Sequence, residues 1–453
     1  MAGIEEAFVN FLLNTKFDDL PEEARTTAEN MFLTIMGTTI AGATLEGVDA
    51  LRDQIKHWGG REEATILLWG DRVPAHHAAL LNSYMARALD CDDGIRPGMH
   101  VGASAVPAAL SASEMAGGCS GKELLTSLVL GGEIADRINL VSKYDGFDPT
   151  GICSIFAATA IACRILSLDR EKTWHALSIA FNRSGGSFQS NIEGSLSVRL
   201  IQGFVAEGAI LSAQLANRGF TGPKAFLEGT YGYFHLYAKD RYDIPMVIGD
   251  LGRRFEFCKT MFKKYPSCGD TISSTEAMLE LVREHDIRPD DVSQIDIKVT
   301  PYAYKLVGGP FQIGQNPRVN AQFSIRYCVA NALLRRGSRL EHFEEAMVRD
   351  PKIMEIVQKV HVEADPLLEE RDETAVEMRV LAKSGAEYRK RIDVAAGFAE
   401  RPLTREEILE RFWNCIDYAK KPLPKRKVEK LVSMLQKLEE LEDIRSLIPL
   451  MLW

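Results

Sequence analysis

The sequence predicts a mainly α fold: a large helical domain formed by both ends of the chain, with a smaller α+β domain inserted between them. Residues 104–142 and 155–220 are rich in Ala, Gly, Ser and Leu at helical spacing, which favours closely packed helices. After about residue 266 the apolar residues begin to alternate with a period of two, as in VSQIDIKV. From about Thr404 they return to helical spacing. We therefore predict a helical domain over residues 1–265 and 404–453 and an α+β lid over residues 266–403.

Local signals predict the individual elements. In FDDLPEEARTTAENMFLTIMG, Pro21 lies in the first turn of a helix that continues with apolar residues at helical spacing. A further helix is expected to begin near Pro74 and to end at the acidic cluster that starts at Asp90, and another to begin near Ser104. In the inserted domain, ETAVEMRVLAKSGAEYRKRIDVAAG has the pattern of a β-hairpin whose turn is residues 383–385.

Composition and charge exclude several classes of function. The 453 residues are 46% hydrophobic and 26% charged, and the formal net charge of −9 without a long basic run argues against a nucleic-acid partner. No apolar run reaches the ~18 residues of a membrane span, and the N-terminus lacks a signal-peptide pattern, so we expect no membrane contact and a cytoplasmic location. The eight cysteines show no metal-ligand spacing, and no glycine-rich piece has a dinucleotide-binding context. We expect no metal and no other cofactor.

The stretch ARALDCDDGIRPGMHVGASAVPAAL carries the main functional signal. Asp90, Asp92 and Asp93 precede a tight loop with the lone His100, and free N–H groups at the following helix start favour a bound anion. These residues predict proton chemistry on a carboxylate substrate. The alternative, a solvated acidic loop in which His100 caps the helix, stays open on residue types alone. A metal held by the three carboxylates is disfavoured, because neighbouring positions on one loop diverge.

Motifs that resemble those of a known family extend over nearly the whole chain. They are DDLPEEA, GTTIAGA, ALDCDD with a following His, GFDPTG, VRLIQGFVAEGAILSAQLANRGFTGPKAFLEG, KKYPSCGDT and AQFSIRYCVANAL. Together they resemble the MmgE/PrpD family, which includes 2-methylcitrate dehydratases, cis-aconitate decarboxylases and an iminodisuccinate epimerase. The resemblance implies a helical large domain, an α+β lid, an active cleft between them and a homodimer.

The chain departs from the family motifs at six positions. Three of the changes remove polar groups of the decarboxylase pattern, where a His, a Lys and a His are replaced by Asp148, Val198 and Gly269. The other three changes fall in the acidic stretch. There, Gly94 replaces a Thr, and Arg96 and Arg87 each replace a His.

The reaction chemistry implied by the resemblance needs a base and fixed cations, because removing a proton next to a carboxylate gives an enolate-like dianion. His100 suits the base, since its ordinary pKa is about 6.5, and Asp90 could hold the imidazole in one tautomer. Lys264, which the resemblance places before YPSC, could bind a substrate carboxylate, or it could simply face solvent. Tyr144 or Tyr265 could donate a proton.

Further substrate contacts are expected around these groups. Arg199 could bind a carboxylate through two parallel hydrogen bonds, or pair structurally with Glu193 or Glu207. The complete set of expected substrate-binding residues is Arg199, Asp93, Asp148, Gln202, Tyr265 and Ser267.

The sequence thus predicts a cofactor-free lyase of the hydratase/dehydratase kind that acts on a small di- or tricarboxylate by α-proton abstraction. An epimerase or isomerase of an imino- or amino-dicarboxylate would share the first step and return the proton elsewhere. A non-catalytic relative that binds a carboxylate is the third alternative. Exchange of a substrate proton with deuterated solvent would separate the two enzymes from the binding protein.

Overall fold

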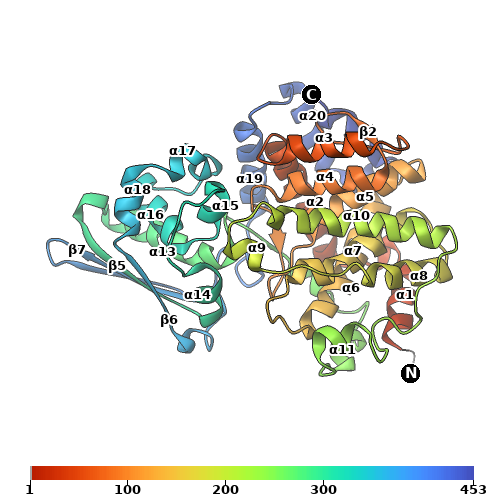
Figure 1. The fold of residues 1–453 in the computed structure, drawn as a ribbon, viewed down its shortest axis with the longest axis horizontal. Helices are drawn as coiled ribbons and strands as arrows, with labels where there is room; N and C mark the ends of the chain where they lie inside the picture. The colour runs from red at the N-terminus through yellow and green to blue at the C-terminus, as the bar shows by residue number, and fades with distance from the viewer. Residues whose placement is uncertain (1–2) are drawn as a thin grey trace.

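Helices from both ends of the chain form one lobe, and a four-stranded sheet with its covering helices forms the other (Figure 1). The computed structural model describes residues 3–453. With 58% of the chain helical and 9% in strands, the prediction of a mainly α fold is confirmed. None of the helices in the described residues is long and apolar enough to cross a membrane.

The helical lobe contains fourteen of the α-helices among the described residues. The long helices α2, α6 and α10 contribute to its core, and their buried faces are rich in Ala, Gly, Ser and Thr, which allows close helix contacts. The helices are α1 (Ile4–Asn14), α2 (Glu22–Gly42), α3 (Val48–Trp58), α4 (Ala75–Arg87), α5 (Gly102–Ala116), α6 (Gly121–Val141), α7 (Pro149–Ile165), α8 (Arg170–Phe181), α9 (Gln189–Ile192), α10 (Ser197–Asn217), α11 (Tyr233–Ala238), α12 (Ile244–Ile248), α19 (Arg405–Tyr418) and α20 (Lys425–Leu435).

The C-terminal helices belong to the same hydrophobic core as the N-terminal ones. Phe412 of α19 packs against Gly37 of α2, where an added Cβ would lie 3.0 Å from its ring. Farther along, Gly121 at the start of α6 donates a backbone hydrogen bond of 2.8 Å to the carbonyl of Leu441. The two ends of the chain are therefore joined by side-chain packing and by the backbone.

Gly121 is the position at which this junction is least tolerant of a side chain. A Cβ at residue 121 would lie 1.6 Å from the carbonyl oxygen of Leu438, so one backbone would have to move. We expect Gly121→Ala to lower the free energy of unfolding by about 1–3 kcal/mol, the usual effect of overpacking. Gly309→Ala is the matched control, because no atom lies within 4 Å of its added Cβ. Equal denaturation midpoints for the two variants would contradict this account of the junction.

The second lobe is built on a mixed sheet with the order β6-β5-β7-β8, in which only the β5–β6 pair is parallel. Inward-facing Ile295, Ile297 and Val299 of β5 are buried under the helices of the lobe. The predicted hairpin is confirmed: β7 and β8 pair across residues 383–385. The strands are β5 (Val292–Val299), β6 (Val360–Ala364), β7 (Val376–Ala382) and β8 (Glu387–Ile392), and the helices are α13 (Gly269–His285), α14 (Pro301–Val307), α15 (Pro317–Gln322), α16 (Ile325–Arg335), α17 (Glu345–Val348) and α18 (Pro351–Val357).

In the described part of the chain, two short strand pairs lie outside this sheet. In the helical lobe, β1 (Ala64–Thr65) pairs with β2 (Arg72–Val73). At the junction of the lobes, β3 (Asp93–Gly94) pairs antiparallel with β4 (Met261–Phe262). The second pair holds the acidic stretch beside the segment that leads into the sheet lobe, and it positions the candidate site.

Candidate active site

A cavity of about 390 Å³ lies between the two lobes. Its helical-lobe wall comes from the acidic stretch, the start of α7 and the first turns of α10, and its other wall comes from the sheet lobe. Among its polar and charged lining residues are Arg87, Asp90, Arg96, His100, Asp148, Thr150, Gln202, Lys263, Cys268, Asp270, Thr300, Tyr302, Glu369 and Glu373.

His100 is held in one orientation at the cavity wall. Its ring Nδ1 lies 2.5 Å from the carbonyl oxygen of Asp93, and its backbone N–H donates to the hydroxyl of Thr150 at 3.0 Å. A carbonyl oxygen only accepts hydrogen bonds, so Nδ1 carries the proton and Nε2 keeps its lone pair. Burial lowers the pKa of His100 to about 4, so the ring is neutral at physiological pH. The arrangement is that of a general base.

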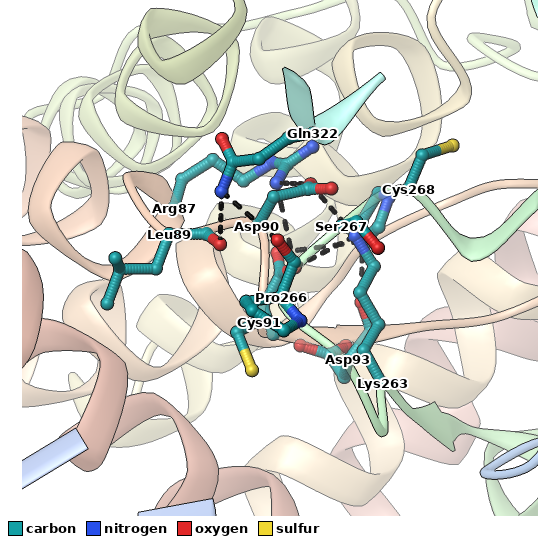
Figure 2. Close-up of polar contacts among 12 residues, drawn as sticks. Arg87, Leu89, Asp90, Cys91, Asp93, Lys263, Pro266, Ser267, Cys268 and Gln322 are labelled. Carbon is teal, nitrogen blue, oxygen red and sulfur yellow. Dashed lines mark hydrogen bonds and ion pairs between the residues drawn. The ribbon is translucent and has the colours of Figure 1, made fainter. Parts of the chain in front are cut away.

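Asp90 lies between two buried cations. The ammonium of Lys263 is 2.8 Å from Oδ1 of Asp90, and the guanidinium of Arg87 bonds to the same oxygen (Figure 2). Burial alone would raise the pKa of Asp90, but Arg87 and Lys263 hold it well below its usual range. The expectation that Asp90 orients the imidazole is therefore wrong, because its contacts are to the cations and the ring bonds to Asp93.

Asp93 occupies the anion site that was expected for a ligand. Its carboxylate accepts hydrogen bonds from the backbone N–H groups of Val101, at 3.2 Å, and Gly102, at 2.9 Å. These are the free donors at the start of α5, so Asp93 caps that helix from eight or nine residues earlier in the chain. A ligand anion at this position is excluded by the side chain, and Asp93 does not line the cavity.

Lys263, and not Lys264, lies in the cavity wall. The extended chain after β4 directs successive side chains to opposite sides. Lys263 therefore points to Asp90 and is buried, whereas Lys264 is one-third exposed in a second groove. The ammonium of Lys264 lies 3.6 Å from Glu407 and 3.9 Å from Glu276. The expectation that Lys264 lies in the cleft and binds a substrate carboxylate is therefore wrong.

Arg199 is also outside the cavity wall. Its buried guanidinium donates to the backbone carbonyl of Glu46 at 2.9 Å and lies 3.2 Å from the Glu46 carboxylate. Arg199 therefore makes a structural ion pair, but its partner lies 153 residues earlier in the chain. It is not Glu193 or Glu207. Because both bonding ends of the guanidinium are occupied, it is not available to a substrate.

The two expected tyrosine donors and Ser267 do not line the cavity either. The Tyr144 hydroxyl bonds to Asn139 inside the helical lobe, and Tyr265 packs in the second groove. Ser267 shares a 2.7 Å hydrogen bond with Thr271.

Two of the other expected residues do reach the cavity. They are Asp148, which also caps α7, and Gln202, which donates to the His100 carbonyl at 3.2 Å.

Tyr302 is the lining tyrosine that sequence reasoning missed. It stands on α14, directly after β5, and its side chain reaches the cavity from the sheet lobe. Partial burial raises the pKa of its hydroxyl, so the group is protonated at neutral pH. The only sequence signal is a tyrosine soon after the end of a strand. Nothing local shows that this strand end faces His100.

Comparison with known proteins decides the family. The model described as the MmgE/PrpD N-terminal domain matches residues 6–244, and the model of the MmgE/PrpD C-terminal domain matches residues 265–437. The chain belongs to the MmgE/PrpD family. The second match extends past the sheet lobe into α19 and α20, which pack with the helical lobe.

Relatives that match almost end to end are named as decarboxylases. The cis-aconitate decarboxylase of Homo sapiens is 25% identical, with 100% of this chain and 95% of the relative covered. That of Mus musculus is 24% identical, with coverages of 98% and 92%. That of Aspergillus terreus is 22% identical, with coverages of 99% and 96%. This MmgE/PrpD chain is thus similar over nearly its whole length to proteins named cis-aconitate decarboxylase.

The six positions at which the resemblance implies a departure from the family motifs all line the cavity. Three of them introduce small or apolar groups, and the other three introduce charged groups of both signs. The six residues are Arg87, Gly94, Arg96, Asp148, Val198 and Gly269. The differences from the family motifs are therefore concentrated where a substrate would bind. In residues 3–453, no cluster of three or more His, Cys, Asp and Glu side chains could hold a metal ion.

Proposed function

We propose that this protein is a lyase of the hydratase/dehydratase type that removes an α-proton from a small carboxylate. The observation that supports this most is the neutral His100, whose Nδ1–H bond to Asp93 leaves Nε2 as the proton acceptor at a cavity wall. Lys263 and Arg87 place two cationic donors at the same wall, where an enolate-like transition state develops negative charge. Both cations are buried, so water screens them little.

In this reaction, Nε2 of His100 takes the α-proton, and the electron pair of that C–H bond moves into the enolate. The pair then forms the carbon–carbon double bond as the β-hydroxyl leaves with a proton from Tyr302, giving water. Tyr302 lines the cavity from the sheet lobe, and its hydroxyl carries a proton at neutral pH. The proton on His100 then passes to the phenolate of Tyr302, directly or through solvent, which restores both groups.

Dehydration is favoured over decarboxylation by the residues at three cavity positions. Where the decarboxylase pattern has two His and a Lys, this cavity presents Asp148, Val198 and Gly269. Arg87 and Arg96 add cations elsewhere in the same cavity, but at these three positions a carboxylate and two uncharged groups replace potential cations. Loss of a hydroxide with a proton does not depend on those cations.

The experiment is a proton-exchange screen by NMR in deuterated buffer. We expect at least one hydroxylated di- or tricarboxylate to gain deuterium at its α-carbon and to form an alkene. cis-Aconitate is the comparison substrate, and it should yield no carbon dioxide. Thermal stabilisation by a carboxylate without exchange would show a non-catalytic binding protein instead. Release of carbon dioxide from cis-aconitate would contradict the dehydratase proposal.

An epimerase or isomerase of an amino- or imino-dicarboxylate is the second candidate, and one observation favours it. The carboxylates of Asp148 and Asp270 line the cavity without an ion pair to any of residues 3–453. Burial raises the pKa of both, in the case of Asp270 to about 6. A cationic nitrogen on the substrate would pair with them. Inversion at the α-carbon with deuterium incorporation and no alkene would identify this activity.

A further inference from the structure

Asp92 has an environment unlike that of the other two carboxylates in the acidic stretch. It is fully buried, and its Oδ2 lies 3.5 Å from Nδ1 of His100. Its Oδ1 lies 3.5 Å from the ammonium of Lys263 and 3.7 Å from the guanidinium of Arg87. Neither oxygen has a hydrogen-bond partner among residues 3–453.

Hydrogen bonding does not explain this carboxylate. Asp90 bonds directly to Arg87 and Lys263, and Asp93 caps α5, so each already has a structural role. Asp92 is instead an anion without hydrogen bonds, which is costly to bury unless nearby positive charge stabilises it. Of its three neighbours, only His100 changes charge during the proposed reaction.

We propose that Asp92 is the positioning residue that stabilises the imidazolium of His100 when Nε2 takes the substrate proton. This inference rests on the proposed function. The ring is already fixed by the bond from Nδ1 to the Asp93 carbonyl, so the new charge appears beside a carboxylate that does not have to move. Preorganised charge of this kind lowers the barrier because no reorganisation is needed during the step.

The charges around His100 make the effect of Asp92 large. Lys263 and Arg87 disfavour the imidazolium, whereas Asp92 and Asp90 favour it, and burial opposes it throughout. Of the two carboxylates, Asp92 is the one in direct reach of the ring. Without its charge, two buried cations would face the ring with only Asp90 to balance them. The pKa of His100 would then fall further below its ordinary value.

The test is Asp92→Asn, which keeps the shape and removes the charge. With nitrogen-labelled histidine, the His100 signals, assigned with a His100→Asn sample, should titrate about one unit lower than in the wild type. With a substrate found by the exchange screen, kcat should fall by about 10–100-fold at nearly constant KM. Asp90→Asn is the comparison, and it should lower the His100 pKa less because Asp90 is farther from the ring.

The titration needs no substrate, so it separates this inference from the proposed function. A lowered pKa in a protein that exchanges no carboxylate proton would support the role of Asp92 and overturn the lyase proposal. An unchanged pKa and kcat in Asp92→Asn, with an active wild type, would overturn the role of Asp92. If Asp92→Asn does not fold, Asp92→Glu is the second test. It moves the carboxylate charge relative to Nδ1 of His100 and should therefore change the His100 pKa. An unchanged His100 pKa in that variant would also overturn the inference.

Discussion

His100→Asn should reduce turnover by about 10²–10⁴-fold while leaving substrate affinity nearly unchanged, as expected for the loss of a general base. The substitution suits this site because the asparagine amide can replace Nδ1 as the donor to the Asp93 carbonyl. The acidic stretch therefore keeps its conformation, and only the acceptor Nε2 is lost. Steady-state kinetics together with a ligand-binding titration measures the two effects separately.

The pH profile of the wild type gives a second readout of the same group. Because burial lowers the pKa of His100 to about 4, the ring stays unprotonated well below the ordinary histidine pKa of about 6.5. The acid limb of kcat/KM should thus lie near pH 4, and activity should persist through pH 5–6. His235→Asn is the control and should keep the wild-type pH profile, since this exposed ring pairs with Asp240 and does not line the cavity. Normal turnover in His100→Asn would assign the histidine a purely structural role.

The sequence predicted those parts of the fold that depend on local periodicity. Helix starts near Pro74 and Ser104 and the hairpin at residues 383–385 are found close to the expected positions. Strand β6 was missed because its five residues VHVEA are too short to show a period. Its parallel pairing with β5 depends on a crossover of some sixty residues, which no local pattern encodes.

The candidate site was predictable within one stretch and not across the lobes. His100 and Asp90 come from the same loop, and both reach the cavity. Arg199 has its partner, Glu46, in a distant loop that sequence spacing could not identify. Tyr302 reaches the site only because the sheet lobe packs against the helical lobe, and that contact is tertiary.

Lys263→Met should lower both turnover and affinity and should also destabilise the fold. The ammonium bonds to Asp90 at 2.8 Å and lies 3.5 Å from Asp92, so its loss leaves two buried carboxylates with Arg87 alone. Breaking a buried ion pair on one side costs about 3–5 kcal/mol. Turnover falls in addition because the developing enolate loses a fixed positive charge.

Lys264→Met is the matched control, because Lys264 is the next residue in the sequence after Lys263. Its ammonium is one-third exposed and meets Glu407 and Glu276 only at 3.6 and 3.9 Å, so its removal should change stability by less than about 1 kcal/mol. Turnover should stay at the wild-type level, because the side chain faces away from the cavity. The reverse result, an active Lys263→Met beside an inactive Lys264→Met, would contradict the assignment of the cavity lysine.

The double variant Lys263→Met with Asp90→Asn separates stability from catalysis. Removing one cation and one anion together leaves Asp92 balanced by Arg87, so the free energy of unfolding should recover most of what the single variant loses. The substrate would still lack the Lys263 charge, and turnover should therefore remain low. Recovery of both stability and turnover would mean that Lys263 serves only to neutralise Asp90. The positive charge for the enolate would then come from Arg87 alone.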